Sequence, residues 1–330
     1  MASGRVPRML RILTVTVPFY QRSLLDRWEY SRGALARRGH AESARIDLVE
    51  RIWDHLIRAA LQEDLANGDF TSELLLAPAE RADGIIRVRE AGILSGLDLA
   101  RRVFELLDET VAFDACKADG DWLDVDEVVA AVNARARKLL GGERVALNFL
   151  MWLSGIATAT YRLQNRLREK GLAIRISDTR KTTPLWRFAE KKAVRHGGGT
   201  NHRMDLGDGV LIKDNHIRLF GDPAEAVRRI RAQSRHIDRI EVEVDAIEQI
   251  EPVLKAGADI VLLDNFTPQQ VREAVKLIGD RAVIEVSGGV TPNNIDDYAI
   301  QGVDVISLGW LTHSAPALNF SMEIEPEGEG

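Results

Sequence analysis

The sequence predicts an α/β protein in which a small α+β domain is followed by a shortened α/β barrel. The 330 residues are about twice the length of a typical domain, so two domains are expected. After Gly171, strand-like apolar runs alternate with helical runs, and the last three strand-like runs end at Leu263, Val286 and Leu308, 23 and 22 residues apart. This alternation indicates parallel βα units. We count six units where a complete barrel has eight, and the pattern favours a shortened barrel over an open sheet.

The composition is that of a globular chain that does not cross a membrane. Hydrophobic residues make up 45% of it and charged residues 28%, with 10 prolines, which excludes the fibrous and disordered classes. No run approaches 18 apolar residues, so neither a membrane-spanning segment nor a membrane partner is predicted. The single cysteine, Cys116, excludes an internal disulfide and a cysteine zinc cluster. It favours a reducing compartment, so we expect a cytoplasmic protein.

The net charge of −6 is divided unevenly along the chain. Residues 1–45 carry nine arginines against three acidic residues, whereas the remainder carries 35 basic against 47 acidic residues. An acidic body binds double-stranded nucleic acid poorly, so no nucleic-acid partner is predicted. The basic segment 1–45 has neither an uninterrupted apolar core nor a small-residue cleavage site. We interpret it as a poorly ordered extension outside the fold.

Residues 46–155 predict the first domain. Apolar residues recur at helical spacing over 46–63, and Asn67-Gly68-Asp69 then ends that helix. Short alternating apolar runs follow between 80 and 135, with a strand at 84–88 and a helix at 97–107. This mixture predicts a small α+β domain. A longer helix at 142–170 leads toward the second domain.

Residues 156–312 predict the second domain. Its strand-like runs end at Ser177, Lys213, Val244, Leu263, Val286 and Leu308. Its helical runs are 185–195, 223–235, 246–255, 268–278 and 293–301. The remaining segment, 313–330, is too short for another βα unit, and we expect it to pack back on the N-terminal domain.

Polar residues gather where these strands end, and the ends of parallel strands meet on one face of a barrel. The cations come first, and they are Arg180, Lys181, His202, Arg203 and Lys213. Because unpaired cations in a cleft are costly, this set predicts a small polyanionic ligand. One charged residue at a strand end usually belongs to a solvated loop, but six consecutive polar strand ends are hard to explain in that way.

Acidic residues and glycines follow at the later strand ends. Glu243 and Asp264 could bind sugar hydroxyl groups or hold Mg²⁺ through water. The glycine-rich ends could bring backbone N–H groups close to a phosphate; these residues are Ser287, Gly288, Gly289 and Gly309. Together with the cations, they predict a phosphosugar and an acidic acceptor as the substrates.

Motifs along almost the whole of 46–320 resemble one family, quinolinate phosphoribosyltransferase. The most specific motifs are DTRKTTP at 178–184, GGGTNHR at 197–203 and LIKDNH at 211–216. The others are EDL at 63–65 with GD at 68–69, ERVALNFL at 143–150, SGIAT at 154–158, EVEV at 241–244, LDN at 263–265 and LGWLTHS at 308–314. Any one of them could arise by chance, but the whole set in this order is highly specific.

The resemblance implies an N-terminal open-faced α/β sandwich, a shortened α/β barrel, and a homodimer or larger assembly in which Arg144 reaches the site of the other subunit. It implies a pentosyltransferase that uses Mg²⁺ and converts quinolinate and phosphoribosyl pyrophosphate to nicotinate mononucleotide, pyrophosphate and CO₂, in de novo NAD biosynthesis. Lys181, Glu243 and Asp264 would be catalytic. Quinolinate would be bound by Arg144, Thr179, Arg180, His202, Arg203 and Lys213. Phosphoribosyl pyrophosphate would be bound by Lys181, Lys213, Asn215, His216, Glu243, Asp264, Ser287, Gly288, Gly289, Leu308, Gly309 and His313, and Mg²⁺ would bind through the substrate and through Glu243 and Asp264.

Four positions depart from the family pattern and leave the acceptor open. Leu185 and Trp186 replace a Gly-Leu pair, Lys192 stands where an aromatic residue is common, and Asp205 stands where glycine is usual. A relative that acts on another pyridine carboxylic acid therefore stays an alternative, as does a catalytically silent relative that only binds a nucleotide or an anion. An aldolase-like enzyme with Lys213 as a Schiff-base residue is a further alternative, although it leaves the acids and glycines of the later strands unexplained.

Overall fold

The computed structural model describes residues 53–328. The chain divides into two compact units, residues 1–56 and residues 57–330, and all the elements discussed below belong to the second unit. The predicted extension 1–45 and the first part of the helix predicted for 46–63 lie outside the described residues. Residues 57–65 are helical, as predicted for that part of the segment. Within 53–328, no helix is both long and apolar enough to cross a lipid bilayer.

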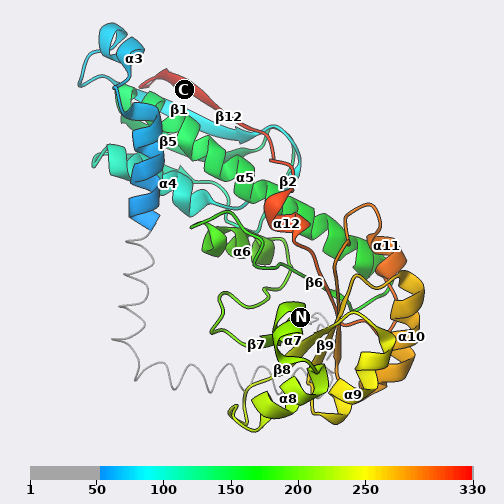
Figure 1. The fold of residues 1–330 in the computed structure, drawn as a ribbon. Helices are drawn as coiled ribbons and strands as arrows, with labels where there is room; N and C mark the ends of the chain where they lie inside the picture. Colours follow the sequence, from blue (N-terminus) through cyan, green and yellow to red (C-terminus); the bar gives the residue numbers. More distant parts are fainter. Residues whose placement is uncertain (1–52, 329–330) are drawn as a thin grey trace, which may run out of the picture. The chain divides into compact units, whose positions relative to one another are not determined.

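The N-terminal sheet is antiparallel, and its strands lie in the order β12-β1-β5-β3 (Figure 1). The strands are β1 (Arg81–Val88), β3 (Ala112–Ala115), β5 (Val128–Arg135) and β12 (Phe320–Pro326). Along β1, buried and partly exposed side chains alternate strictly, so one face of this strand packs into the domain core. A separate small sheet pairs β2 (Gly92–Ile93) with β4 (Trp122–Leu123).

Two helices of this domain form from local sequence signals. The short helix α3 (Phe70–Leu75) begins after Asp69, whose side chain accepts a hydrogen bond from the amide of Ser72 and caps the helix. The helix α4 (Leu97–Leu107) has the bounds that the sequence predicts. Gly96 precedes α4 with a φ of 98°, a left-handed conformation that glycine adopts without steric cost.

The 34-residue helix α5 (Ala136–Glu169) runs from the N-terminal sheet into the barrel (Figure 1). It packs against α4 and the N-terminal sheet, and also against the barrel elements β6 (Arg175–Ser177) and α6 (Arg187–His196). The sequence predicts only 142–170, because the pair Gly141-Gly142 resembles the signal of a helix boundary. The predicted division between residues 155 and 156 falls inside α5.

Six parallel strands form the second sheet, in the order β6-β11-β10-β9-β8-β7. Besides β6, they are β7 (Val210–Ile212), β8 (Ile240–Val244), β9 (Ile260–Asp264), β10 (Val283–Ser287) and β11 (Val305–Ser307). The predicted α/β fold with six βα units is therefore confirmed. The strand ends predicted at Ser177 and Val244 are correct, and the other four are displaced by one residue, because sequence patterns locate strands better than they locate strand ends.

The hydrogen-bonded ladder is open between its two edge strands, β6 and β7. On the β6 side, Thr200 forms an isolated parallel bridge with Ser177. The amide of Thr200 donates to the carbonyl oxygen of Ile176 at 2.8 Å. The segment 197–203 therefore occupies the position beside β6 that a further strand would take, and it brings His202 and Arg203 to the carboxyl end of this strand.

Helices between the later barrel strands, such as α9 (Ile250–Lys255) and α10 (Pro268–Ile278), lie along the outside of the sheet (Figure 1). The other helices between barrel strands, besides α6, are α7 (Asp214–Phe220), α8 (Pro223–Arg231), η1 (Ile247–Gln249), η2 (Gly279–Arg281) and α11 (Ile295–Tyr298). The short helix α12 (Trp310–His313) follows the last barrel strand, β11, and precedes β12. The helix predicted for 268–278 has the predicted bounds. The helix predicted for 223–235 ends at Arg231, because the next four residues are polar or small and none of them is buried. The helix predicted for 293–301 covers only α11, since Ala299 leaves the helical conformation with a ψ of 68°.

The C-terminal segment returns to the first domain. β12 pairs with β1, with Phe320 opposite Val88 and Pro326 opposite Ala82. On its way, the chain crosses α5 at Gly155, where a Cβ atom would lie 2.2 Å from the carbonyl oxygen of Pro316. The close approach of these two segments therefore depends on a glycine at this position.

Candidate active site

Acidic side chains are buried within two strands of the barrel sheet, β8 and β10. All five residues of β8 are buried, and two of them are Glu241 and Glu243. Because alternate residues of a strand point to the same face, these two carboxylates lie on one side of the sheet. Glu285 of β10 is also buried. Buried carboxylates need hydrogen bonds or cationic partners, and the preceding segments supply them.

A buried ion pair fixes the backbone that carries His202. Lys191 of α6 and Asp178, which follows β6, are both fully buried and form this pair. Burial raises the pKa of Asp178 and lowers that of Lys191, while each partner opposes the shift of the other. Lys191 Nζ also donates to the carbonyl oxygen of His202 at 2.8 Å, and Asp178 Oδ1 accepts from the amide of His202 at 3.0 Å. Two buried side chains therefore hold the peptide groups of His202 in place.

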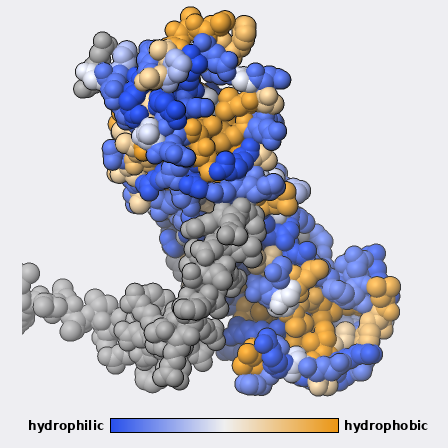
Figure 2. All heavy atoms as spheres, turned by 90° about the vertical axis from the view of Figure 1, so that its left-hand side faces the viewer, coloured by the Kyte–Doolittle hydropathy of each residue, from blue (hydrophilic) through white to orange (hydrophobic). Residues whose placement is uncertain are grey.

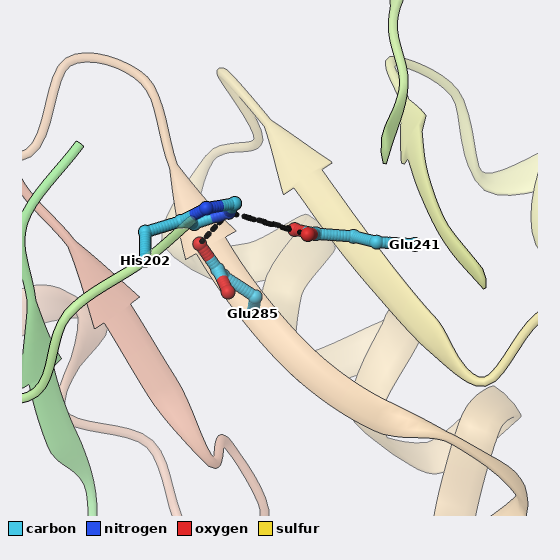
Figure 3. Close-up of side chains that lie close together, drawn as sticks. All are labelled: His202, Glu241 and Glu285. Atoms are coloured by element: carbon cyan, nitrogen blue, oxygen red, sulfur yellow. Dashed lines mark hydrogen bonds and ion pairs between the residues drawn. The ribbon is translucent and has the colours of Figure 1, made fainter. Parts of the chain in front are cut away.

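The ring of His202 points toward two buried carboxylates (Figure 3). Its Nε2 atom lies 3.2 Å from an oxygen of Glu241 and 3.6 Å from an oxygen of Glu285. Its Nδ1 atom accepts a hydrogen bond from the amide of Arg203 at 2.7 Å. Both ring nitrogens thus have partners within the protein, and a contact between His202 and a substrate would require the exchange of one of them.

The two arginines near this cluster lie within reach of each other's charge. Burial lowers the pKa of Arg203, and the positive charge of Arg180 lowers it further. Arg203 Nη1 donates to the carbonyl oxygen of Gly209 at 3.3 Å. The Nε atom of Arg180 is buried and has no hydrogen-bond partner among the described residues. A ligand with two negative charges would both relieve the repulsion and satisfy the unpaired N–H group.

The ends of β7, β8 and β9 bring Lys213, Glu243 and Asp264 together. Lys213 Nζ donates to Glu243 Oε2 at 3.0 Å. Burial raises the pKa of Asp264, the charge of Glu243 raises it further, and Lys213 opposes the shift. Because the side chain of Lys213 is 45% exposed and paired with a carboxylate, it lacks the desolvation that activates a Schiff-base lysine. The aldolase-like alternative therefore gains no support from this site.

Lys181 and His313 flank Gly309, at the loop that follows β11. A Cβ atom at Gly309 would lie 2.9 Å from Lys181 Cδ and 3.3 Å from His313 Nε2. The hydroxyl of Thr312 donates to the carbonyl oxygen of Lys181 at 2.7 Å, and the hydroxyl of Thr179 accepts from the amide of Lys181 at 3.1 Å. These contacts join the loops after β6 and β11, so residues about 130 positions apart in the sequence form one surface.

The glycine-rich turn after β10 lies against the end of β9. Gly288 and Gly289 have φ values of 80° and 65°. A Cβ atom at Gly288 would lie 2.5 Å from Asn265 Oδ1, so only glycine fits there. Successive amides in such a turn are able to bind a phosphate oxygen. Leu308 differs from these positions, because its side chain is buried and its amide already donates to the carbonyl oxygen of Ser177 at 3.0 Å.

Three of the predicted site residues have other surroundings. Arg144 lies on the first part of α5, where its side chain is 58% exposed and 3.9 Å from its neighbour Glu143. No contact described in the structure joins it to the strand ends. Asn215 and His216 begin α7, and His216 Nδ1 accepts from the amide of Lys213 at 2.9 Å. His216 therefore caps the helix that follows Lys213.

The four departures from the family pattern occupy structural positions around the site. Trp186 packs against two aromatic rings of α5, with ring centroids 4.9 and 5.9 Å apart. Lys192 forms an ion pair with a carboxylate in the first turn of α4. Asp205 accepts a hydrogen bond from an amide two residues later. Leu185 is exposed and has a φ of 71°. These environments explain how the four residues fit into the fold, and they do not indicate which pyridine carboxylic acid is the substrate.

Sequence reasoning did not assign Asp178, Lys191, Glu241 or Glu285 to the site. Asp178 opens the DTRKTTP motif and Glu241 opens the EVEV strand, so their positions carried a usable signal. Glu285 is a single charge within the apolar run VIEVS, and an acid in a buried strand is a signal of the same kind. Lys191 is one of two adjacent lysines on a polar helix, and nothing in the sequence distinguishes the buried one.

Protein-family models match both parts of the chain. The model described as quinolinate phosphoribosyl transferase, N-terminal domain, matches residues 69–154, and the model of the C-terminal domain matches residues 156–323. A protein of Bacillus subtilis named probable nicotinate-nucleotide pyrophosphorylase (carboxylating) is 42% identical over 267 residues, which cover 81% of this chain and 91% of that protein. The Mycobacterium leprae protein named nicotinate-nucleotide pyrophosphorylase (carboxylating) is 39% identical over 277 residues, which cover 81% and 95%.

Solved structures agree with these sequence matches. NadC from Streptococcus pyogenes superposes with a TM-score of 0.78 at 39% identity, over 83% of this chain and 96% of that chain. The nicotinate-nucleotide pyrophosphorylase from Francisella tularensis superposes with a TM-score of 0.79 at 36% identity, over the same shares of the two chains. The family models, the relatives and the solved structures all cover the antiparallel domain and the barrel together. This chain belongs to the quinolinate phosphoribosyltransferase family.

Proposed function

We propose that this chain transfers the phosphoribosyl group of phosphoribosyl pyrophosphate to quinolinate and gives nicotinate mononucleotide, pyrophosphate and CO₂, in NAD biosynthesis. The names of its relatives support a carboxylating nicotinate-nucleotide pyrophosphorylase. The observation that carries the choice of a dianionic acceptor is the pair formed by Arg180 and Arg203. Their charges repel, and the buried Nε of Arg180 has no partner among the described residues. A dicarboxylate supplies the charge and the acceptor oxygens that this pair lacks.

We propose that two further residues bind quinolinate together with Arg180 and Arg203. Thr179 and Lys213 stand at the ends of β6 and β7, on either side of the open ladder. Together with the arginines they would hold both carboxylates, so that the ring nitrogen faces the anomeric carbon of the ribose. Fixing this orientation before reaction removes much of the entropic barrier to the transfer.

The transfer itself needs little covalent chemistry from the protein. The lone pair of the pyridine nitrogen forms the bond to the anomeric carbon, while the carbon–oxygen bond to pyrophosphate breaks and its electron pair leaves with pyrophosphate. Glu243 and Asp264, which are buried or half-buried at the ends of β8 and β9, would stabilise the positive charge that develops on the ribose. Lys181 and His313, which flank Gly309, would bind phosphate oxygens of the donor.

Loss of CO₂ follows from the charge of the product. Once the nitrogen carries the ribose, the ring is a pyridinium, and the bond to the carboxyl group beside the nitrogen breaks with its electron pair delivered to the ring. A proton from solvent then replaces the carboxyl group. The pyridinium therefore performs the task of an electron sink, and the chain needs to hold only the second carboxylate in place.

Mg²⁺ fits the acidic end of the site. The charge of Glu243 raises the pKa of Asp264, so a cation near both carboxylates would be stabilised, and carboxylates with water are the usual ligands of Mg²⁺. When bound, Mg²⁺ would neutralise charge on the pyrophosphate group. Lys213, which already pairs with Glu243 at 3.0 Å, keeps part of this charge compensated in the free protein.

In a homodimer, Arg144 of one subunit would bind quinolinate in the site of the other subunit. This exposed residue lies on the N-terminal domain, and Leu140, one turn earlier on the same face of α5, is also exposed. Phe70, Leu74 and Leu75 of the neighbouring helix α3 are exposed as well, and hydrophobic surface is visible at the α3 end of this domain (Figure 2). An apolar surface beside an exposed arginine is suited to a second copy of the chain that receives the arginine in its site.

Mixing two inactive variants tests this sharing directly. Arg144→Ala leaves the barrel intact, and Lys213→Ala leaves Arg144 intact, so each homodimer lacks one part of every site. In mixed dimers, one of the two sites would combine both intact parts, and activity should recover to roughly a quarter of that of the wild type when all pairings are equally frequent. Recovery should be absent for a mixture of Lys213→Ala with Arg203→Ala, because both changes then lie in the barrel. No recovery in the first mixture would contradict the proposed donation.

The reaction is tested with the purified chain, phosphoribosyl pyrophosphate, Mg²⁺ and a panel of pyridine carboxylic acids that includes quinolinate. Quinolinate should give nicotinate mononucleotide, with one pyrophosphate and one CO₂ released for each product molecule. Consumption of another pyridine acid in place of quinolinate would establish the alternative substrate. Binding of the anionic ligands without release of pyrophosphate would establish a silent relative. Omission of Mg²⁺ tests the metal requirement in the same assay.

A further inference from the structure

The cluster of His202, Glu241 and Glu285 has the residue types of a metal site. One potential ligand atom from each residue lies within 4.8 Å of the others. Glu241 and Glu285 are buried, and one oxygen of Glu285 has no hydrogen-bond partner among the described residues although it faces the ring of His202. Histidine nitrogens and carboxylate oxygens are both among the ligands of Zn²⁺. The cluster therefore has two possible functions, metal binding or control of the histidine ring.

The hydrogen bonds of His202 distinguish these functions. A histidine that binds a metal through Nε2 normally donates its Nδ1–H to an acceptor. Here the Nδ1 atom accepts, because the amide of Arg203 points at it from 2.7 Å. The neutral ring must then carry its hydrogen on Nε2, the atom that lies 3.2 Å from Glu241. A metal cannot take the place of that hydrogen while the Arg203 amide keeps its present contact.

We propose that Glu241 is a positioning residue for substrate binding, which holds the ring of His202 so that the ring in turn holds the amide of Arg203. The contacts form one series: the carboxylate of Glu241 accepts the Nε2–H group, and Nδ1 accepts the N–H group of Arg203. Glu241, which is buried in the barrel, thereby helps to orient Arg203, whose guanidinium group contacts the acceptor in the proposed function. This inference rests on the proposed function for the identity of that acceptor.

Glu285 has a different part in the same cluster. Its carboxyl group is buried beside Glu241, and two ionised carboxylates around one neutral ring would repel each other. Burial and the charge of Glu241 raise the pKa of Glu285 to about 7. Glu285 Oε1 lies 3.6 Å from Nε2 and has no hydrogen-bond partner among the described residues, whereas Glu241 lies 3.2 Å from that atom. Glu241 is therefore the carboxylate that accepts the Nε2–H group.

The two Glu→Gln substitutions should therefore have unequal effects on substrate binding. Glu241→Gln replaces the carboxylate that accepts the Nε2–H group by a neutral amide, whereas Glu285→Gln changes a carboxyl group whose facing oxygen forms no hydrogen bond with the ring. Glu241→Gln should raise KM for quinolinate about tenfold and KM for phosphoribosyl pyrophosphate by less than about twofold. The effect of Glu285→Gln should be several-fold smaller, and Glu273→Gln on the exposed face of α10 controls for the loss of a charge. Equal increases for both KM values in Glu241→Gln, or equal effects of the two cluster variants, would overturn the proposal.

A spectroscopic measurement tests the contact without any substrate. In protein labelled with ¹⁵N-histidine, the wild type should show His202 with hydrogen on Nε2 and a bare Nδ1, and Glu241→Gln should shift that signal toward a mixture of tautomers. The opposite tautomer in the wild type would refute the proposed orientation. Zn²⁺ added alone should leave the His202 signals unchanged; a specific shift at one equivalent would establish the metal site in place of the positioning role.

The two measurements separate failure of this inference from failure of the proposed function. An inactive wild type would contradict the reaction, while the tautomer of His202 and its response to Glu241→Gln could still be read. Conversely, normal turnover of quinolinate by Glu241→Gln with unchanged KM would leave the reaction in place and remove Glu241 from the positioning of Arg203.

Discussion

Arg180 and Arg203 lie near enough for the charge of Arg180 to lower the pKa of Arg203, which burial already lowers. The backbone beside them is fixed by the buried pair of Lys191 and Asp178, which bonds to the peptide groups of His202. The position of Arg203 therefore depends on buried contacts of the preceding residue as well as on its own hydrogen bond to Gly209. A site prepared in this way loses little entropy when the acceptor binds.

Arg203→Ala should raise KM for quinolinate at least ~10-fold, because a charge-assisted hydrogen bond worth ~1.5–3 kcal/mol is lost. Arg203→Lys should recover only part of this loss, since lysine keeps the charge but lacks the planar fork. Steady-state kinetics with both substrates varied is the measurement. Arg272→Ala, at an exposed position of α10, is the matched control. An unchanged dependence on quinolinate would remove Arg203 from the acceptor pocket.

Glu190 of α6 should make the stability of the fold depend on pH. Burial raises its pKa from 4.5 to about 7, although the amide of Thr183 donates to both of its oxygens and opposes the shift. Between these two pH values the unfolded chain has lost the proton and the folded chain keeps it. The free energy of unfolding should therefore fall by about 3 kcal/mol from pH 4.5 to pH 7, with no further loss from this group above that range.

Glu190→Gln tests this dependence, because the amide cannot ionise. Denaturant unfolding at several pH values should show a smaller decrease for this variant than for the wild type, and Glu273→Gln should behave like the wild type. Parallel curves for all three proteins would show that Glu190 does not keep its proton in the fold.

The residue types of the site could be predicted from the sequence, but several of the contacts between them could not. The cations and glycines stand at strand ends, and the order of strands alone places strand ends on one face. The contacts of Lys191 and Glu285 depend instead on which side chains meet across the barrel, and that meeting depends on the curvature of the sheet and on the path of 197–203. The pattern of residues along the sequence does not encode the curvature of the sheet or the path of this segment.

The helix α5 contains two glycine positions with opposite requirements. At Gly155, a Cβ atom would lie 2.2 Å from the carbonyl oxygen of Pro316 and 2.9 Å from the Cα atom of Ala317. At Gly141, the nearest atom would be a side-chain carbon of Leu65 at 3.4 Å, an ordinary contact. An added Cβ atom would therefore contact backbone atoms at Gly155 and a flexible side chain at Gly141.

Gly155→Ala should destabilise the protein by about 1–3 kcal/mol, because the C-terminal segment has to move away from the helix. Gly141→Ala should stabilise it by up to about 1 kcal/mol, since alanine is the better helix former. Thermal and denaturant unfolding of both variants against the wild type is the measurement. A stabilising effect at Gly155 would show that the segment around Pro316 does not need its close approach to α5.

The helices and strands differ in how well the sequence predicts them. α4 and α10 have their predicted bounds because each has a continuous apolar stripe. The sequence does not predict α7, because none of its residues is buried and no periodic pattern marks it. The six-unit α/β fold follows from the alternation of strands and helices, whereas the open ladder between β6 and β7 depends on long-range geometry that no local pattern encodes.

The whole chain combines a basic N-terminal segment with an acidic body, and the cations of the candidate site all belong to the body. The family models begin at residue 69 and together extend to residue 323. Removal of residues 1–45 should therefore leave kcat and both KM values unchanged, because no residue of the proposed chemistry is lost. Kinetics of the shortened and full-length proteins, prepared side by side, is the measurement. A large change in either KM would assign a role in catalysis to the basic segment.

The continuity of α5 also has a mechanical consequence. A helix of 34 residues is about 50 Å long, and it passes through the point where the two family models meet. The antiparallel domain and the barrel therefore share one continuous helix, and a large rotation of one against the other would have to bend or break it. Local rearrangement of the segments around Lys181 and Arg203 is the less costly route for the entry and release of substrates.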